Sequence, residues 1–133
     1  ISCMEKALKS AHLSCNDIDY ISAHGTGTKL NDKIESKALC SVFKEKVPPV
    51  SSIKSMIGHS LGAAAAIEAV ANLLMIQHNL AVPTANFEEA DEECPIDCIP
   101  NKCRSMKIDN IISNAFAFGG NNSSLVISRY KEE

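Results

Sequence analysis

The sequence lacks the features that mark several common functional classes. It has neither a basic cluster nor a long acidic tail, with 13 basic and 16 acidic residues among 133, so its charge gives no indication of a nucleic-acid partner. No stretch approaches the roughly 18 consecutive apolar residues that a membrane-spanning helix needs. The N-terminus also lacks the zones of a signal peptide. We therefore expect no nucleic-acid binding and no membrane insertion.

The cysteines do not form a recognisable metal motif. Six are present, at positions 3, 15, 40, 94, 98 and 103, and the spacing of the last three matches no common zinc signature. We expect reduced thiols, as in a protein that is not secreted.

The residues that are present predict a single α/β domain, because 45% of them are apolar and the chain is long enough for one core. The first residues already form an amphipathic helix with no preceding cap, which predicts a chain cut within an element. Apolar periodicity and turn residues predict helices at 2–13, 31–43 and 63–78, and strands at 18–23, 47–53, 108–113 and 124–130. The segment 79–107 is predicted to be mostly loop, with one or two short strands.

The predicted helix at 63–78 is apolar on nearly every face. Such a helix is normally buried on all sides, and its four consecutive alanines indicate close packing against its backbone. We therefore expect it at the centre of a layered fold.

His24 is the first candidate functional residue. It follows a predicted strand and precedes the small residues of Gly25-Thr26-Gly27-Thr28, where a rigid scaffold meets an accessible loop. The hydroxyls of Thr26 and Thr28 can hydrogen-bond a polar ligand. Taken alone, these side chains are more typical of ordinary loop residues.

Lys54 and His59 form a second candidate pair just before the long apolar helix. The positive end of that helix and the lysine would both lower the pKa of His59, which favours a neutral imidazole that donates a hydrogen bond. The alternative is a histidine that caps the helix beside a solvated lysine.

The segment Gly58-His59-Ser60-Leu61-Gly62 also satisfies G-x-S-x-G, the nucleophile elbow of serine hydrolases and acyltransferases. That elbow requires an apolar strand running directly into it, whereas polar Lys54 and Ser55 precede this one. Only His78, deep in the helix, follows it as a candidate base.

The segment from Phe116 to Asn122 is the fourth candidate. Gly119 and Gly120 permit a backbone reversal, and Phe118 is a large apolar side chain beside them. The alternative is a plain β-hairpin with an aromatic core anchor.

These features occur in an order that resembles the last third of a β-ketoacyl-acyl carrier protein synthase of type II fatty acid synthesis. The matching segments are His24-Gly25-Thr26-Gly27-Thr28-Lys29-Leu30-Asn31-Asp32, Ser52 to Ala64, Val82-Pro83-Thr84-Ala85-Asn86, and Asn114 to Asn122. Four ordered motifs cover nearly the whole chain.

The resemblance implies catalytic roles for three residues. His24 and His59 would bind the thioester carbonyl of a malonyl group and stabilise the enolate oxyanion that develops as carbon dioxide leaves. Lys54 would maintain the geometry and electrostatics of His59, with Glu35 as its partner.

The resemblance also implies a substrate channel. Thr26 and Thr28 would hydrogen-bond the phosphopantetheine arm of acyl carrier protein, beside Phe116, and Phe118 would be the gating phenylalanine. Ala117 stands where the family usually has glycine, which predicts a stiffer loop. The milder departure is Asn121, where threonine is usual.

The remaining roles implied by the resemblance are supporting ones. Asp32, Gly119 and Gly120 would shape the site. In some relatives a structural cation is surrounded by residues that match Glu68, Ser113 and Asn114, although Ser22 stands where those relatives have asparagine. No metal or nucleotide is expected to be required for the chemistry.

The fold implied by the resemblance is thiolase-like, and residues 1–133 would form most of its C-terminal half. The nucleophilic cysteine of such enzymes heads a buried helix in the N-terminal half, and none of the six cysteines here has that context. We therefore expect the chain to be inactive alone and to require that half, in a parent that forms a homodimer. A polyketide ketosynthase domain is the alternative; the compartment stays open among bacterial cytoplasm, plastid and mitochondrion.

Overall fold

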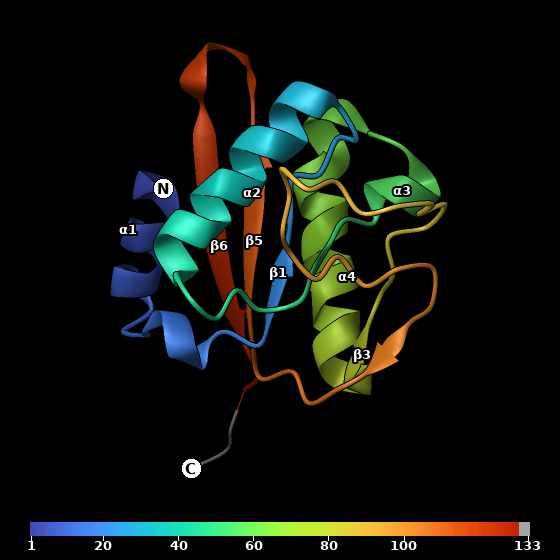
Figure 1. The fold of residues 1–133 in the computed structure, drawn as a ribbon. Helices are drawn as coiled ribbons and strands as arrows, with labels where there is room; N and C mark the ends of the chain where they lie inside the picture. Colours follow the sequence, from blue (N-terminus) through green and yellow to red (C-terminus); the bar gives the residue numbers. More distant parts are fainter. Residues whose placement is uncertain (131–133) are drawn as a thin grey trace.

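The computed structural model describes residues 1–130, which form a mixed sheet with helices on both faces (Figure 1). The helices are α1 (Ser2–Ser10), α2 (Lys29–Phe43), α3 (Lys54–Ile57) and α4 (Ala64–His78), with 3₁₀ turns at Cys15–Asp17, Leu61–Ala63 and Phe118–Gly120. The strands are β1 (Tyr20–Ser22), β2 (Val50–Ser51), β3 (Leu80–Ala81), β4 (Arg104–Ser105), β5 (Asn110–Phe116) and β6 (Asn122–Ser128).

The main sheet has the strand order β2-β1-β5-β6. β1 runs parallel to both β2 and β5, with Ser22 opposite Ser51 on one side and Ser113 on the other. β6 returns antiparallel to β5 as a hairpin, and β3 and β4 form a separate small ladder. The carboxyl ends of β1, β2 and β5 therefore meet at one edge of the sheet, where α/β folds commonly place their sites.

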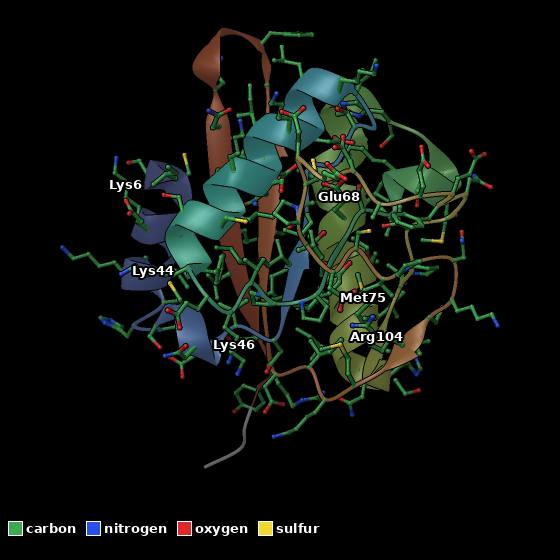
Figure 2. All side chains as sticks on the ribbon, viewed as in Figure 1. Lys6, Lys44, Lys46, Glu68, Met75 and Arg104 are labelled. Atoms are coloured by element: carbon green, nitrogen blue, oxygen red, sulfur yellow. The ribbon has the colours of Figure 1, made fainter. Side chains whose placement is uncertain are left out.

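Alternating side chains of the central strands build two apolar clusters. Ile21 and Ile112 pack with α1 and α2, including Leu39 of α2. Tyr20 and Ile111, one residue earlier on each strand, pack on the other face with Met75 of α4, which is labelled in Figure 2. The period-two geometry of the strands thus fixes which helix covers which face.

Helix α4 is buried on one face only, which corrects the expectation of burial on all sides. Ile67, Val70, Leu73 and Leu74 are 39–59% exposed, whereas Met75 on the sheet side is 3% exposed. One sheet layer can cover only one face of a helix. The apolar outer face therefore has no cover among residues 1–130.

The stretch Leu61–His78 corrects the expectation that no segment approaches the length and apolar character of a membrane-spanning helix. Its 18 residues have a mean hydropathy of 1.3, long and apolar enough by composition alone for a membrane span. Its inner face packs on β5 and carries the buried carboxylate of Glu68, although only 28% of the stretch is buried within residues 1–130.

Most of the other predicted elements are confirmed, with shorter limits. The first helix ends at Ser10, because His12 takes a left-handed φ of 55°. The second begins at Lys29, two residues before its predicted start at 31, and is capped by Thr28, whose hydroxyl accepts from the backbone N–H of Asn31 (3.4 Å). The predicted hairpin at 116–122 and the short strands within 79–107 are both present.

Candidate functional site

The candidate site lies at the carboxyl edge of the sheet. His24 comes two residues after β1 ends, Lys54 comes three residues after β2 ends, and Phe116 is the last residue of β5. Because these strands are parallel and adjacent, residues far apart in sequence are brought together here. The sequence-predicted strand-end position of His24 is confirmed.

The two histidines face each other. The ring centroids of His24 and His59 are 5.6 Å apart, with the rings nearly perpendicular at 84°. Phe116 packs on His24 with a centroid distance of 5.5 Å. His24 is only 8% exposed, whereas His59 is exposed. The arrangement is a pair of imidazoles with an apolar wall on one side and an open approach on the other.

The backbone fixes the tautomer of His59. The N–H of Leu61 donates to Nδ1 of His59 (3.1 Å), so Nδ1 acts as an acceptor. In a neutral imidazole the proton then resides on Nε2. His59 is therefore held as a donor whose N–H is available to a ligand.

Glu35 supports the loop that carries His24. Its two carboxylate oxygens accept from the backbone N–H groups of His24 and Gly25, both at 2.9 Å. The side-chain amides of Asn114 (3.3 Å) and Asn31 (3.4 Å) also donate to it. Burial raises the pKa of Glu35, and these donors offset part of that rise. The carboxylate thus fixes the backbone at His24 from α2.

The partner of Lys54 is Glu68, and the predicted Lys54–Glu35 pair is wrong. Nζ of Lys54 forms a buried ion pair with Oε1 of Glu68, with side chains 5% and 3% exposed. Figure 2 labels Glu68 on α4. The carboxylate of Glu35 already accepts hydrogen bonds from the backbone of the His24 loop. Glu68 lies on α4, which follows α3 after one 3₁₀ turn. The ion pair joins the β2 end of the site to α4.

Gly25 is required by a close approach of two strand ends. Its φ is +45°, and a Cβ there would lie 2.6 Å from Cβ of Ser52. Any other residue would push the segment after β1 away from the segment after β2. The glycine therefore permits His24 and Lys54 to share one site.

We predict that His24 remains neutral well below neutral pH. Burial, Lys54 and His59 lower the pKa of His24 to about 4, from the 6.5 that is usual for histidine. The unfolded chain therefore binds more protons than the folded chain between these values, so the stability that His24 confers is complete above pH 6.5 and is lost as the pH falls through 4. An imidazole NMR titration, assigned with His24→Gln, checks this; a midpoint near 6.5 would contradict the burial argument.

The residues expected to line a substrate channel follow the same strand ends or belong to the β5–β6 turn. The hydroxyls of Thr26 and Thr28 lie 3.1 Å apart, so one of them donates to the other while Thr28 also caps α2. Phe118 is fully exposed at the tip of the β5–β6 turn. Asp32 accepts from the amide of its neighbour Asn31 (3.0 Å).

The loop after β5 corrects the expectation for Ala117. Its backbone is extended, with φ −132° and ψ 161°, so an alanine is unstrained there. Positive φ is taken instead by Gly119 (77°) and Gly120 (80°). The amide of Asn121 donates to the carbonyl of Phe118 (3.3 Å) and closes the turn.

The segment Gly58 to Gly62 does not have the geometry of a nucleophile elbow. A one-turn helix, α3, precedes it instead of a strand, and the following turn is 3₁₀. Ser60 is exposed, and its only possible base in the chain after it, His78, ends α4. The serine-hydrolase interpretation is therefore not supported.

The residues expected around a structural cation have protein partners. Glu68 is paired with Lys54, while Asn114 donates to Glu35 and accepts from the hydroxyl of Ser124 (2.8 Å). Ser113 lies beside Asn114 on β5. Within residues 1–130 no group of three or more His, Cys, Asp or Glu side chains is placed to hold a metal ion. The cation site remains an expectation from resemblance.

The sequence is similar to known condensing enzymes. Residues 1–88 match the family described as "Beta-ketoacyl synthase, C-terminal domain". The chain is 47% identical to the 3-oxoacyl-(acyl-carrier-protein) synthase 2 of Coxiella burnetii over 96% of its own length and 31% of that protein's. It is 45% identical to the tetracenomycin polyketide synthase ketoacyl synthase alpha subunit of Streptomyces glaucescens, over 95% of this chain and 30% of that one.

The fold is also that of solved ketosynthases. A structure of a type II PKS acyl-carrier protein in complex with its ketosynthase superimposes with a TM-score of 0.94 at 39% identity, covering 98% of this chain and 32% of that chain. The thiolase-like α/β fold is thereby confirmed. The chain spans about a third of the length of the relatives it matches. It belongs to the β-ketoacyl synthase family, whose C-terminal domain it matches.

Proposed function

We propose that this chain supplies the malonyl-decarboxylating half of the active site of a 3-oxoacyl-acyl carrier protein synthase. The facing pair of His24 and His59, with centroids 5.6 Å apart, carries the proposal. Two donors at this separation can converge on one carbonyl oxygen. Transferase chemistry of the ketoacyl synthase kind is the activity of the relatives.

The catalytic role of the histidines follows from where charge develops. Loss of carbon dioxide from a malonyl thioester leaves an enolate, whose negative charge lies on the former carbonyl oxygen. Nε2–H of His59 is held ready to donate, and a lowered pKa keeps His24 neutral at physiological pH. Preorganised donors stabilise that oxyanion more than the ground-state carbonyl, so they lower the barrier.

Lys54 is a positioning residue in this proposal. Its buried ammonium is one of the groups that lower the pKa of His24, after burial itself. Its ion pair with Glu68 holds this charge in place. The lysine thereby keeps the histidine neutral without contacting the substrate.

The substrate carrier would be the phosphopantetheine arm of acyl carrier protein. Thr26 and Thr28 present hydroxyls beside His24, and exposed Phe118 lies at the tip of the neighbouring turn. These groups would bind the arm and control access. The acyl carrier protein found with a related ketosynthase supports this partner.

The complete condensation requires residues outside this chain. In the reaction proposed, a cysteine of the N-terminal part takes the acyl group, and the enolate attacks that thioester. The exposed apolar face of α4 would be covered by that part, and the intact parent would form a homodimer. Alone, the chain would bind malonyl thioester but would not condense it.

A polyketide ketosynthase is an equally compatible parent, since such a subunit is 45% identical over nearly the whole chain. Both activities share the decarboxylation step and the same histidines. Product analysis with saturated acyl primers and with poly-β-keto primers separates the two.

The test measures carbon dioxide release from malonyl-acyl carrier protein by this chain, alone and with a separately produced N-terminal part of a related synthase. We expect release and condensation only after complementation. A chain that condenses acyl groups by itself would contradict the half-site proposal. Ester hydrolysis in place of decarboxylation would contradict the reaction class.

A further inference from the structure

A cavity of about 680 Å³ lies behind the His24 loop, between α2 and the segment 84–100. The residues Gly25, Thr26, Glu35 and Lys54 contribute to its wall, so it adjoins the site described above, but neither His24 nor His59 lines it. The proposed malonyl site therefore does not account for this space.

The inner wall of the cavity is apolar, and it also carries two thiols. Leu39 of α2, Val50 of β2 and Ile96 of the covering segment contribute aliphatic surface. Cys94 and Cys98 line the same cavity, and both are free and partly buried. A small apolar molecule would thus lie in contact with nucleophilic sulfur.

One polar group in the wall has no partner. Ser36 of α2 lines the cavity and is 1% exposed. Within residues 1–130 its Oγ makes no hydrogen bond of normal geometry, although it lies close enough to the Cys94 thiol to lower the pKa of that thiol. An unsatisfied buried hydroxyl is costly and uncommon. It is suited to donate to the carbonyl oxygen of a bound molecule.

The charges around the cavity exclude anions. Asp32, Glu89 and Asp91 all line it, whereas the ammonium of Lys54 is neutralised by Glu68. Lys29 is the other cation in the wall. A carboxylate ligand would be repelled, so the cavity differs in chemistry from the proposed malonyl site.

We propose that this cavity binds small uncharged α,β-unsaturated carbonyl compounds and that Cys94 is the residue they modify. The ligand carbonyl accepts a hydrogen bond from Ser36, and the thiolate of Cys94 adds to the β-carbon. A sulfur–carbon bond forms, the carbon–carbon π bond breaks, and the thiol proton ends on the α-carbon. No oxidant or further reactant is needed.

Cys94 is preferred to Cys98 because it lies beside Ser36. Burial raises the pKa of both thiols; the Ser36 hydroxyl offsets part of that rise at Cys94, and a backbone hydrogen bond offsets part of it at Cys98. A raised pKa leaves most of the thiol protonated at neutral pH. Selectivity must then come from binding in the cavity, so the modification rate should saturate with reagent concentration.

The test compares two maleimides with the same reactive ring, neutral N-ethylmaleimide and anionic 6-maleimidohexanoate, by peptide mass spectrometry of each cysteine. Exposed Cys103 serves as the control without a cavity, and partly buried Cys15 reports labelling through unfolding. With the neutral reagent we expect saturation at Cys94 and linear kinetics at Cys103. With the anionic reagent the ratio of Cys94 to Cys103 labelling should fall about tenfold.

A matched variant tests the hydrogen bond. Ser36→Ala removes the unpaired hydroxyl and should raise the half-saturating concentration at Cys94 about fivefold, with Cys103 unchanged. Should the variant fail to fold, the comparison of the two reagents still decides. Two results together would overturn the proposal. The labelling rate of Cys94 would rise linearly with reagent concentration and equal that of Cys15, and the neutral and anionic reagents would label Cys94 equally well.

Discussion

Replacing His59 with alanine, in a synthase containing this chain, is expected to slow malonyl decarboxylation by about 10²–10³-fold, the usual effect of removing one oxyanion donor. Its Nε2–H is the donor that the Leu61 N–H contact with Nδ1 preserves. His24→Ala should have a similar effect, since the two rings form one facing pair. Carbon dioxide release and transfer of the acyl group to the cysteine should be measured separately, because acylation does not form this enolate.

Ser60→Ala is the matched control for these variants. Ser60 is adjacent to His59 and is also exposed, and its side chain does not cap the turn that follows. Decarboxylation should therefore be unchanged in this variant. Loss of acylation with retained decarboxylation in His59→Ala, or inactivity of Ser60→Ala, would contradict the assigned roles.

The sequence was sufficient to predict the positions of the catalytic candidates. A short strand followed by His24, and the Lys54–His59 segment before an apolar helix, are local patterns. The structure brings them together because β1 and β2 are parallel neighbours. The position of each candidate just after a predicted strand therefore indicated that the candidates lie close together in space, although no single motif did so.

The side chains and backbone groups that bond to these candidates were harder to predict from the sequence. Glu35 was assigned to Lys54, but its oxygens are used by backbone N–H groups of the His24 loop, a contact with no side-chain signature. A signal for the true partner did exist. Glu68 is the only Asp, Glu, Lys or Arg in α4, and a lone carboxylate in a helix this apolar requires a buried partner.

The burial of α4 was predicted wrongly for a different reason. Composition reports the environment in which a helix is stable in its whole protein, whereas within residues 1–130 the main sheet covers only one face of α4. The exposed residues Ile67, Val70 and Leu73 form the face that the N-terminal part is proposed to cover. Periodicity alone cannot distinguish a missing layer from a present one.

Glu68→Ala is expected to be the most destabilising single substitution near the site. It would leave the ammonium of Lys54 in a position where the side chain is 5% exposed, without its ion-pair partner. Removing one member of a buried pair typically costs about 3–5 kcal/mol. For a domain of this size, the midpoint of thermal unfolding should fall by about 10–20 °C.

The double variant Lys54→Met, Glu68→Leu separates the cost of an unpaired charge from the cost of losing the pair. Apolar side chains of similar volume remove both charges at once, and such replacements are often neutral or stabilising. The double variant should therefore unfold at a higher temperature than Glu68→Ala, and close to the parent chain. Equal destabilisation of the two variants would show that α4 depends on Glu68 for packing rather than for charge. The pKa of His24 should also rise in the double variant, because the positive charge of Lys54, which helps to lower that pKa, has been removed.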